Sequence, residues 1–370
     1  MAAAPNEEVG LAVVGLGYWG PYLVRNAFEL PDVRMVAACD ADMAALAPLG
    51  RRYPGLKLTT SLDEVLADPD VDGVLIATPI STHLTLGLKV LEAGKHAFIE
   101  KPLAETPEDA AVLIEAAARH ERVLMVGHTF LYSPPVNFIK AMLDSGELGE
   151  IYFGTSSRVN LGIHQSGASV VRDLAPHDFS ILHYWFGEPS FVRAIGRASV
   201  VPGTLDVVFI DIGYPNGLLI HLELSWLSPT KLRRTVLVGS EKMVVYEDTS
   251  DEQVRVFDRG VDVIEPQSFG EYQLSYRSGD VLTPRLDADE PLRVEVADFA
   301  QCIRTGEEPR SNGESGLAVA RMMQATEASL EWNGAPAALD TGSTERRSTP
   351  DRRRNVGGMP VVPQQQTDRA

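Results

Sequence analysis

The stretch VVRDLAPHDFSIL, residues 170–182, places Asp173, Pro176 and His177 at the start of an apolar segment. Proline is tolerated in the first turn of a helix and aspartate is a favoured N-cap, so the pattern predicts a helix that begins at or just after Asp173. Residues four apart share a helix face, which brings this carboxylate and imidazole together. Such a pair can bind polar ligands and move protons. The alternative is that Asp173 only caps the helix and His177 only lies on its surface.

A second group of residues suited to ligand binding lies near the N-terminus, in LAVVGLGYWGPYLVRN. Three glycines in the spacing Gly-x-Gly-x-x-Gly separate an apolar strand from a helix, and they let the backbone approach a pyrophosphate at the helix N-terminus. A carboxylate at the end of the next strand, Asp40, binds the adenosine ribose and repels a 2′-phosphate. We therefore expect NAD as the cofactor, with NADP as the alternative. The expected cofactor contacts include Gly15, Gly17, Tyr18, Trp19, Gly20 and Asp40.

Composition narrows the class of protein. A chain of 370 residues with 44% hydrophobic content can bury the cores of two domains. The formal net charge of −18 repels phosphate backbones and anionic lipid, so we expect neither a nucleic acid nor a membrane partner. The N-terminus lacks a cationic region followed by an apolar run, and the two cysteines lie far apart in the sequence. These features predict a cytoplasmic protein without disulfides or a zinc site.

From residue 9 to about residue 145 the chain alternates short apolar runs with helical patterns, which is typical of a doubly wound parallel sheet. Helix starts are readable at Ser61, with Glu64 completing a capping box, and at Thr106. We place a dinucleotide-binding domain at residues 9–127, after a flexible N-terminus of residues 1–8. Its predicted strands are VGLAVVG, RMVAACD, LKLTT, GVLIATP, HAFIEKP and VLMVGH.

A second domain, of α+β class, is expected at residues 128–341, with a large, mostly antiparallel, open-faced sheet. Its predicted strands are EIYFGTSSRVN, FVRAIGRASVV, LDVVFIDIGY and GLLIHLELSWL, and its closing helices are EVADFAQCIRT and GLAVARMMQATEASLEW. In LLIHLELSW the apolar side chains alternate with His221, Glu223 and Ser225, whose face is free to meet solvent or another subunit. We therefore expect a homodimer or homotetramer. Residues 342–370 are polar and basic and predict a disordered tail.

The segment IATPISTHLTLGLKVLEAGKHAFIEKPLAET goes beyond generic dinucleotide binding. It resembles the Gfo/Idh/MocA family of oxidoreductases, whose fourth and fifth strands carry a TP…H and a GKH…EKP pattern. SGELGEI and the Asp-x-x-x-His helix start resemble the same family, so the resemblance covers nearly the whole ordered chain. It implies a Rossmann domain in which Thr78, Pro79 and His83 lie along the cofactor and Glu100 and Lys101 lie near the nicotinamide. It also implies that Asp173 and His177 face the reacting carbon of a sugar.

Hydride transfer explains why such a site would hold these groups. A hydride leaves a secondary alcohol carbon as the hydroxyl proton is removed, which requires a base and a cation near the oxygen. We assign the base to His177 and the cation to Lys101, and Asp173 can orient either the imidazole or the sugar hydroxyls. A metal is not expected, because Asp173 and His177 lack a third ligand in sequence and hydride transfer needs none. The simpler alternatives are that Lys101 is a solvated strand-end lysine, Glu100 an ion-pair partner and His83 a helix-surface residue.

The substrate is expected to be a sugar. The sequence DLAPHD is similar to a branch of the family associated with polysaccharide and unusual-sugar pathways, which favours a nucleotide-linked hexose over free inositol. Further substrate contacts are expected from a loop between the domains, at Arg158, Asn160, His164 and Arg172. The alternatives are a dehydrogenase of free polyols and a dinucleotide-binding regulatory protein without turnover, which would need only the glycine turn and Asp40.

Overall fold

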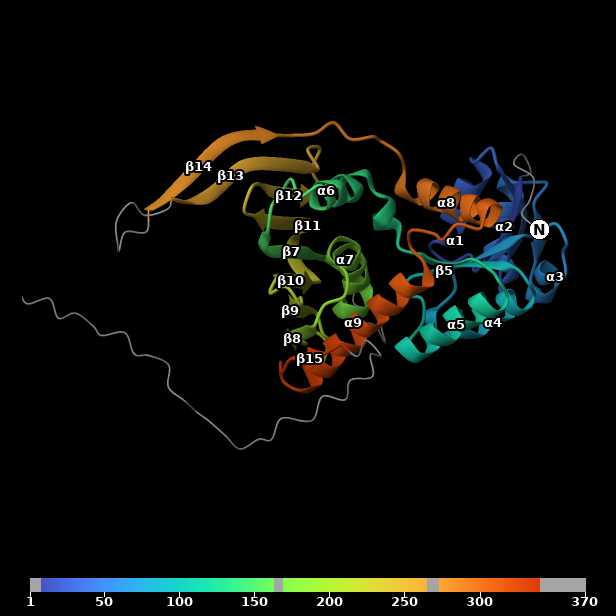
Figure 1. Cartoon of the computed structure of the whole chain (residues 1–370). Helices are drawn as coiled ribbons and strands as arrows, with labels where there is room; N and C mark the ends of the chain where they lie inside the picture. Colours follow the sequence, from blue (N-terminus) through green and yellow to red (C-terminus); the bar gives the residue numbers. More distant parts are fainter. Residues whose placement is uncertain (1–7, 163–168, 265–272, 340–370) are drawn as a thin grey trace, which may run out of the picture. The chain divides into compact units, whose positions relative to one another are not determined.

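Residues 9–127 form a parallel sheet with its helices (Figure 1), as the alternating pattern predicts. Its strand order β3-β2-β1-β4-β5-β6 is that of a Rossmann domain. The order reverses between β1 and β4, and ligands of such sheets bind beside the carboxyl ends of the strands at that point. The strands are β1 (Val9–Val14), β2 (Val33–Cys39), β3 (Lys57–Thr59), β4 (Gly73–Ile76), β5 (His96–Glu100) and β6 (Leu124–Gly127).

Two helices of this layer, those that follow Ser61 and Thr106, begin where their caps predict. The Ser61 hydroxyl accepts a hydrogen bond from the Glu64 amide at 3.4 Å, and the Thr106 hydroxyl accepts one from the Asp109 amide at 3.1 Å. Each satisfies an amide that the first helical turn leaves without a partner. The helices are α1 (Gly20–Phe28), α2 (Met43–Arg52), α3 (Leu62–Leu66), α4 (His83–Glu92) and α5 (Pro107–Arg119).

One later helix, α8 (Pro291–Thr305), also belongs to this layer. Its Phe299 meets Phe98 of β5 edge to face, with ring centroids 5.9 Å apart, and its Leu292 and Val296 join the same core. The sequence places this helix in the second domain, and that expectation is wrong. Amphipathic periodicity predicts that a helix has a buried face but not which sheet the face meets.

The second sheet is large and mostly antiparallel, as predicted. Its order within the described residues is β14-β13-β12-β11-β7-β10-β9-β8-β15, and only the neighbours β7 and β10 run parallel. The sequence analysis predicts β7 (Ile151–Leu161), β8 (Phe191–Arg197), β9 (Val207–Gly213) and β10 (Leu219–Ser225). It does not predict β11 (Leu227–Gly239), β12 (Met243–Glu247), β13 (Val254–Ile264), β14 (Gln273–Leu282) or β15 (Ala337–Ala338).

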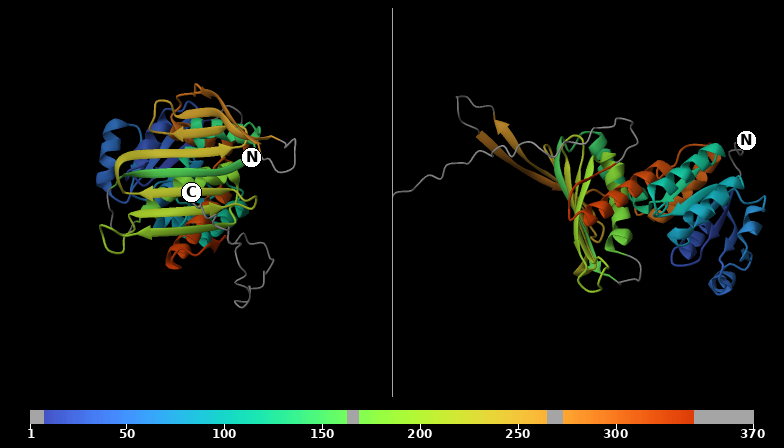
Figure 2. Two further views of the ribbon diagram at one scale, coloured as in Figure 1. Left: turned by 90° about the vertical axis from the view of Figure 1, so that its left-hand side faces the viewer. Right: turned by 90° about the horizontal axis from the view of Figure 1, so that it is seen from below.

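Within the part of the chain that the structure describes, helices cover one face of this sheet and leave the other open (Figure 2). On the covered face, Ile220, Leu222 and Leu224 of β10 are buried, as the alternation predicts. The covering helices are α6 (Pro134–Asp144), α7 (Val170–Phe186) and α9 (Gly313–Glu331). The opposite face exposes His221, but Ser225 is buried there, contrary to expectation, and its hydroxyl accepts from the Leu227 amide at 3.0 Å.

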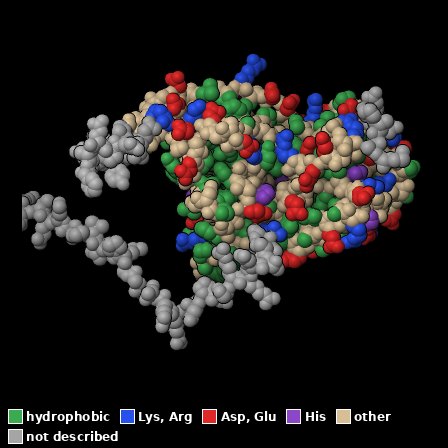
Figure 3. Space-filling view, in the orientation of Figure 1, with side chains coloured by type: hydrophobic (Ala, Val, Ile, Leu, Met, Phe, Trp, Pro, Cys, Tyr) green, Lys and Arg blue, Asp and Glu red, His purple; other side chains and the backbone are tan. Residues whose placement is uncertain are grey.

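The computed structural model describes residues 8–162, 169–264 and 273–339. The predicted tail, most of the predicted flexible N-terminus and the candidate His164 therefore lie outside the described residues. No helix of the described residues is long and apolar enough to cross a membrane. On the face shown in Figure 3, acidic and basic side chains are interspersed.

Candidate active site

The glycine turn after β1 is shaped to receive a ligand. Gly15 has a φ of 92°, a region that favours glycine, and a Cβ there would lie 2.6 Å from the Ala77 carbonyl oxygen. A Cβ on Gly20 would lie 2.0 Å from the Gly15 carbonyl oxygen, so α1 packs tightly on the turn. Gly17, in contrast, has no atom within 4 Å of where its Cβ would be. That open space at the N-terminus of α1 fits a pyrophosphate.

Asp40 connects the end of β2 to this turn. Its Oδ2 accepts a hydrogen bond from the Leu16 amide at 2.6 Å, and its Oδ1 accepts one from the Asp42 amide at 2.8 Å. Each carboxylate oxygen has a second lone pair, so the half-buried group can also accept ribose hydroxyls. The residues at this end of the sheet therefore fit NAD.

The next three candidates follow β4. Thr78 is half-buried, with its hydroxyl 2.7 Å from that of Thr82, and Pro79 is exposed. His83 is only 1% exposed, and its two ring nitrogens lie 2.9 Å from the carbonyl oxygens of Thr78 and Pro102. The expectation that His83 lies along the cofactor is therefore wrong: the imidazole joins the loops after β4 and β5. Burial lowers its pKa, although both carbonyls favour the protonated ring.

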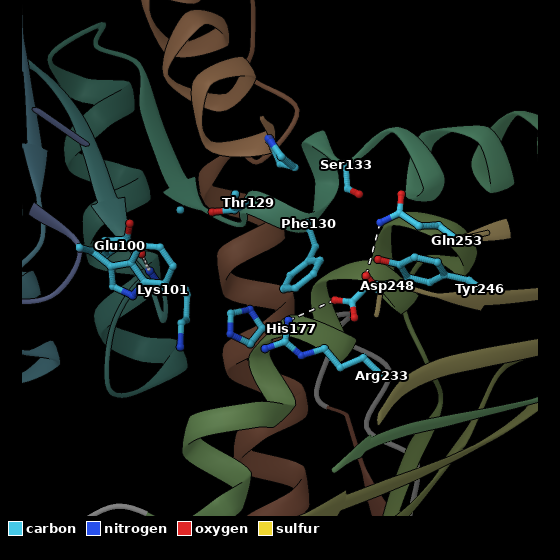
Figure 4. Close-up of a pocket in the computed structure, with 13 residues that line it drawn as sticks. Glu100, Lys101, Thr129, Phe130, Ser133, His177, Arg233, Tyr246, Asp248 and Gln253 are labelled. Atoms are coloured by element: carbon cyan, nitrogen blue, oxygen red, sulfur yellow. Dashed lines mark hydrogen bonds and ion pairs between the residues drawn. The ribbon is translucent and has the colours of Figure 1, made fainter. Parts of the chain in front are cut away.

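A cleft of about 300 Å³ opens beside the carboxyl end of β5 (Figure 4). Glu100 and Lys101 lie at one end of it, and Phe130 and His177 lie in the middle. Trp19 of the glycine turn also lines the cleft, while Tyr18 packs edge to face on the Trp19 ring and is largely exposed. The far end is lined by Ser133, Arg233, Tyr246, Asp248 and Gln253.

Burial controls the charges at the β5 end. It raises the pKa of Glu100 to about 7 and lowers the pKa of Lys101, whose charged form Asp173 and Glu100 both favour. Behind Glu100, the buried Glu295 of α8 accepts a hydrogen bond from Thr129 Oγ1 at 2.8 Å. Burial and the nearby Glu100 hold the pKa of Glu295 well above its usual range. Lys101 thus combines a desolvated amino group, whose pKa burial lowers, with acidic neighbours that favour its charged form.

His177 projects from α7, which begins earlier than predicted. The helix starts at Val170, because Ser169 is the N-cap and its hydroxyl accepts from the Arg172 amide at 3.4 Å. Asp173 therefore lies in the first turn and does not cap the helix, which corrects the sequence prediction. Its Oδ2 accepts a hydrogen bond from the Trp226 indole at 3.0 Å. This bond fixes the carboxylate where it acts on the charge of Lys101.

The environment of His177 favours the neutral imidazole. Burial holds its pKa well below the usual range, and the nearby cations Lys101, Arg158 and Arg233 act in the same direction. The ring packs edge to face on Phe130, with centroids 5.2 Å apart. A neutral imidazole facing the cleft can accept a proton at pH 7.

Arg158 supports the cleft from behind rather than lining it. Its side chain and that of Asp178 are each 5% exposed and form an ion pair, to which the Ser156 hydroxyl adds a bond of 2.9 Å to Asp178. The Arg158 guanidinium also lies 4.8 Å from the centroid of the Phe130 ring. The prediction that Arg158 contacts substrate is therefore wrong in this structure, because a side chain so deeply buried has no face toward the ligand.

Two other substrate candidates lie away from the cleft. Arg172 forms an ion pair of 2.8 Å with Glu327, and these side chains are 53% and 42% exposed. Asn160 is half-buried on β7 and is not among the residues that line the cleft. The placement of Arg172 does not agree with the predicted substrate contact, while a substrate contact by Asn160 stays a prediction. Among the residues that the structure describes, no group of three His, Cys, Asp or Glu side chains is placed to hold a metal ion.

The far end of the cleft was missed from the sequence. Thr129, Phe130 and Ser133 follow β6, so the rule that ligands bind after parallel strands could have found them. Arg233, Asp248 and Gln253 lie on and between strands that the sequence analysis does not predict. Nothing in the local pattern distinguishes them from solvated polar residues.

The fold and this cleft define an NAD-binding oxidoreductase. Residues 9–128 match the family described as "Oxidoreductase family, NAD-binding Rossmann fold", and residues 136–245 match the GFO/IDH/MocA C-terminal domain. The chain belongs to the Gfo/Idh/MocA family, as the resemblance implied.

Similar proteins act on polyols and sugars. A scyllo-inositol 2-dehydrogenase (NAD(+)) of Bacillus subtilis is 27% identical, with 90% of this chain and 97% of that protein covered. The structure of a UDP-N-acetylglucosamine 3-dehydrogenase from Acidithiobacillus ferrooxidans is similar with a TM-score of 0.74 at 23% identity, covering 88% of this chain and 98% of that one. An oxidoreductase from Agrobacterium radiobacter, solved with NAD⁺, L-tartaric acid and magnesium, gives a TM-score of 0.75 at 21% identity, with 90% and 98% covered.

Proposed function

We propose that this protein is a dehydrogenase or ketoreductase that moves a hydride between NAD and a ring carbon of a sugar or polyol. The observation that carries the proposal is the neutral imidazole of His177, which faces Lys101 in a cleft at the carboxyl edge of the Rossmann sheet. A regulatory protein that only binds a dinucleotide would need the glycine turn and Asp40 but no base and cation together in the cleft.

Each residue of the cleft has its own role in the proposed reaction. The Lys101 ammonium donates to the substrate oxygen and stabilises alkoxide character, while a ring nitrogen of His177 accepts the hydroxyl proton. The indole of Trp226 holds Asp173, whose negative charge favours the protonated form of Lys101. Bound NAD supplies the hydride acceptor, and Gly15, Gly17, Gly20 and Asp40 would hold it. In the reducing direction His177 donates the proton to the substrate oxygen, and Lys101 donates a hydrogen bond to the carbonyl oxygen.

The test is NADH formation by the purified protein with a panel of sugars. The panel contains scyllo-inositol, D-glucose, UDP-glucose and UDP-N-acetylglucosamine, each added to protein saturated with NAD⁺. The DLAPHD motif favours the nucleotide-linked members, and the free polyols are the second candidate. We expect turnover of at least one member of the panel. Tight dinucleotide binding without turnover of any would instead support the regulatory protein.

Cofactor choice provides a prediction at Asp40. The carboxylate is fixed by two backbone amides and repels a 2′-phosphate, so we expect tighter binding of NADH than of NADPH. Asp40→Ser removes the charge and should narrow the ratio of the two dissociation constants by about tenfold. Fluorescence titration of both reduced cofactors measures the ratio. Preference of the unmodified protein for NADPH contradicts the prediction.

We also propose that the open face of the second sheet joins subunits. Large apolar side chains are exposed there on neighbouring strands, and the pair Asp211–His221, with atoms 2.8 Å apart, lies among them. An exposed apolar face of this kind is typical of an association surface. These apolar side chains are Phe153, Ile195, Phe209 and Leu219.

Light scattering tests the assembly. We expect a dimer or tetramer at micromolar protein, and Phe209→Lys should shift it toward the monomer because a charge would be buried at the interface. Arg34→Glu, on an exposed part of the first domain, serves as the control. A monomer at all concentrations contradicts the proposal.

A further inference from the structure

The far end of the cleft holds a group of polar side chains that the proposed chemistry does not use. Arg233 projects from β11, Asp248 follows β12 and Gln253 precedes β13. Figure 4 shows them on the side of Phe130 opposite Lys101. Because the reacting carbon lies near His177 and Lys101, this end faces the part of the substrate that does not react.

Asp248 is held rigidly and has one oxygen without a partner. Its amide donates to the Arg233 carbonyl at 3.2 Å, and its carbonyl accepts from Gln253 Nε2 at 3.4 Å. Its Oδ2 accepts from Arg233 Nη1 at 3.1 Å, while Oδ1 is buried and has no hydrogen-bond partner. The side chain is 13% exposed. Each carboxylate oxygen has two lone pairs, so the Asp248 carboxylate, which lines the cleft, retains acceptor capacity for a ligand hydroxyl.

The charge of this end is balanced. The positive charge of Arg233 is already paired with Asp248, and its guanidinium lies 5.8 Å from the centroid of the Phe130 ring. A diphosphate would need unpaired cations, and here it would meet the Asp248 carboxylate. An uncharged sugar or polyol offers hydroxyl donors to Asp248 and acceptors to Arg233 and Gln253. Its C–H groups can pack on the rings of Phe130 and Tyr246.

We propose that Asp248 and Arg233 form a subsite for the hydroxyl groups of an uncharged sugar or polyol, and that this subsite disfavours a phosphate-bearing substrate. The proposal rests on the proposed function and deepens it by naming the substrate class. It departs from the expectation, based on DLAPHD, of a nucleotide-linked sugar. The motif does not determine the charge of the ligand: its second aspartate, Asp178, pairs with Arg158 beneath the cleft.

The experiment compares uncharged probes with nucleotide-bearing ones, and the unmodified protein with a variant in which Asp248 has lost its charge. D-Glucose, UDP-glucose, scyllo-inositol and free UDP are titrated calorimetrically into the NADH-saturated protein, and kcat and KM are measured with the sugars. We expect an uncharged probe to bind more tightly than UDP-glucose. Asp248→Asn, which keeps the shape, should raise the KM of that probe by about 10- to 100-fold and leave NADH affinity unchanged. It should also tighten UDP binding, because a repelling charge is gone.

Controls separate this subsite from folding and from the proposed function. Asp144→Asn makes the same change at an exposed helix position and should alter neither KM nor UDP binding. If Asp248→Asn fails to fold, Gln253→Ala should raise the same KM. Tighter binding of UDP-glucose than of any uncharged probe, or an unchanged KM in Asp248→Asn, overturns the subsite while turnover itself upholds the proposed function. The subsite proposal is also overturned if neither D-glucose nor scyllo-inositol binds.

Discussion

Replacing His177 by alanine is expected to slow hydride transfer by about 10²- to 10⁴-fold while NAD affinity stays nearly unchanged. The imidazole is held neutral in the cleft, so the variant loses the group that accepts the hydroxyl proton. The glycine turn and Asp40 are untouched, so the cofactor should still bind. Single-turnover measurements with saturating cofactor separate the chemical step from binding.

Lys101→Ala should slow hydride transfer by a similar factor, because the ammonium group stabilises the developing alkoxide. His120→Ala, at the end of α5 and outside the cleft, is the matched control and should keep the normal rate. Thermal melting checks that each variant is folded. Near-normal rates in both His177→Ala and Lys101→Ala would mean that the start of α7 serves structure alone.

The second large effect is expected on stability, at the ion pair beneath Phe130. Asp178→Ala should lower the free energy of unfolding by about 3–5 kcal/mol, since it leaves the Arg158 guanidinium buried without a counter-charge. Ser156 would also lose its acceptor. Urea denaturation measures this free energy. The comparison requires that the slope of the unfolding free energy against urea concentration is the same in the variant and the unmodified protein.

An exposed ion pair provides the control for this stability change. Glu327→Ala breaks the contact with Arg172 on the surface and should cost less than about 1 kcal/mol. Equal losses in Asp178→Ala and Glu327→Ala would show that burial does not set the strength of the Arg158–Asp178 pair.

The start of α7 shows what the sequence can and cannot predict. Both Ser169 and Asp173 are cap residues, and Pro176 favours a start at Asp173 because proline suits the first turn. The helix instead begins at Val170, and Pro176 lies inside it, where it removes one backbone hydrogen bond. Burial of Val170 and Val171 offsets that loss. Tertiary packing therefore outweighs the preference of Pro176 for the first turn of a helix.

The candidate site likewise contains residues that the sequence predicts and residues that it does not. Lys101 and His177 could be predicted because each lies within a motif, after a parallel strand or near a helix start. Arg233 and Asp248 could not, because their proximity depends on the pairing of β11 with β12, where Arg234 lies opposite Glu247. Arg158 was misassigned for a related reason. Its partner Asp178 lies 20 positions away, and no local pattern shows that the two charges are buried together.

The placement of His83 has a consequence for the thermodynamics of ligand binding. Loops after neighbouring parallel strands are usually ordered separately, and a ligand that must order them binds more weakly because conformational entropy is lost. Here one imidazole contacts the carbonyls of both Thr78 and Pro102, so folding itself restrains the two loops together. The loop after β4 and the backbone that follows Lys101 are thereby preorganised. Dinucleotide binding then loses less conformational entropy than it would if the ligand had to order both loops.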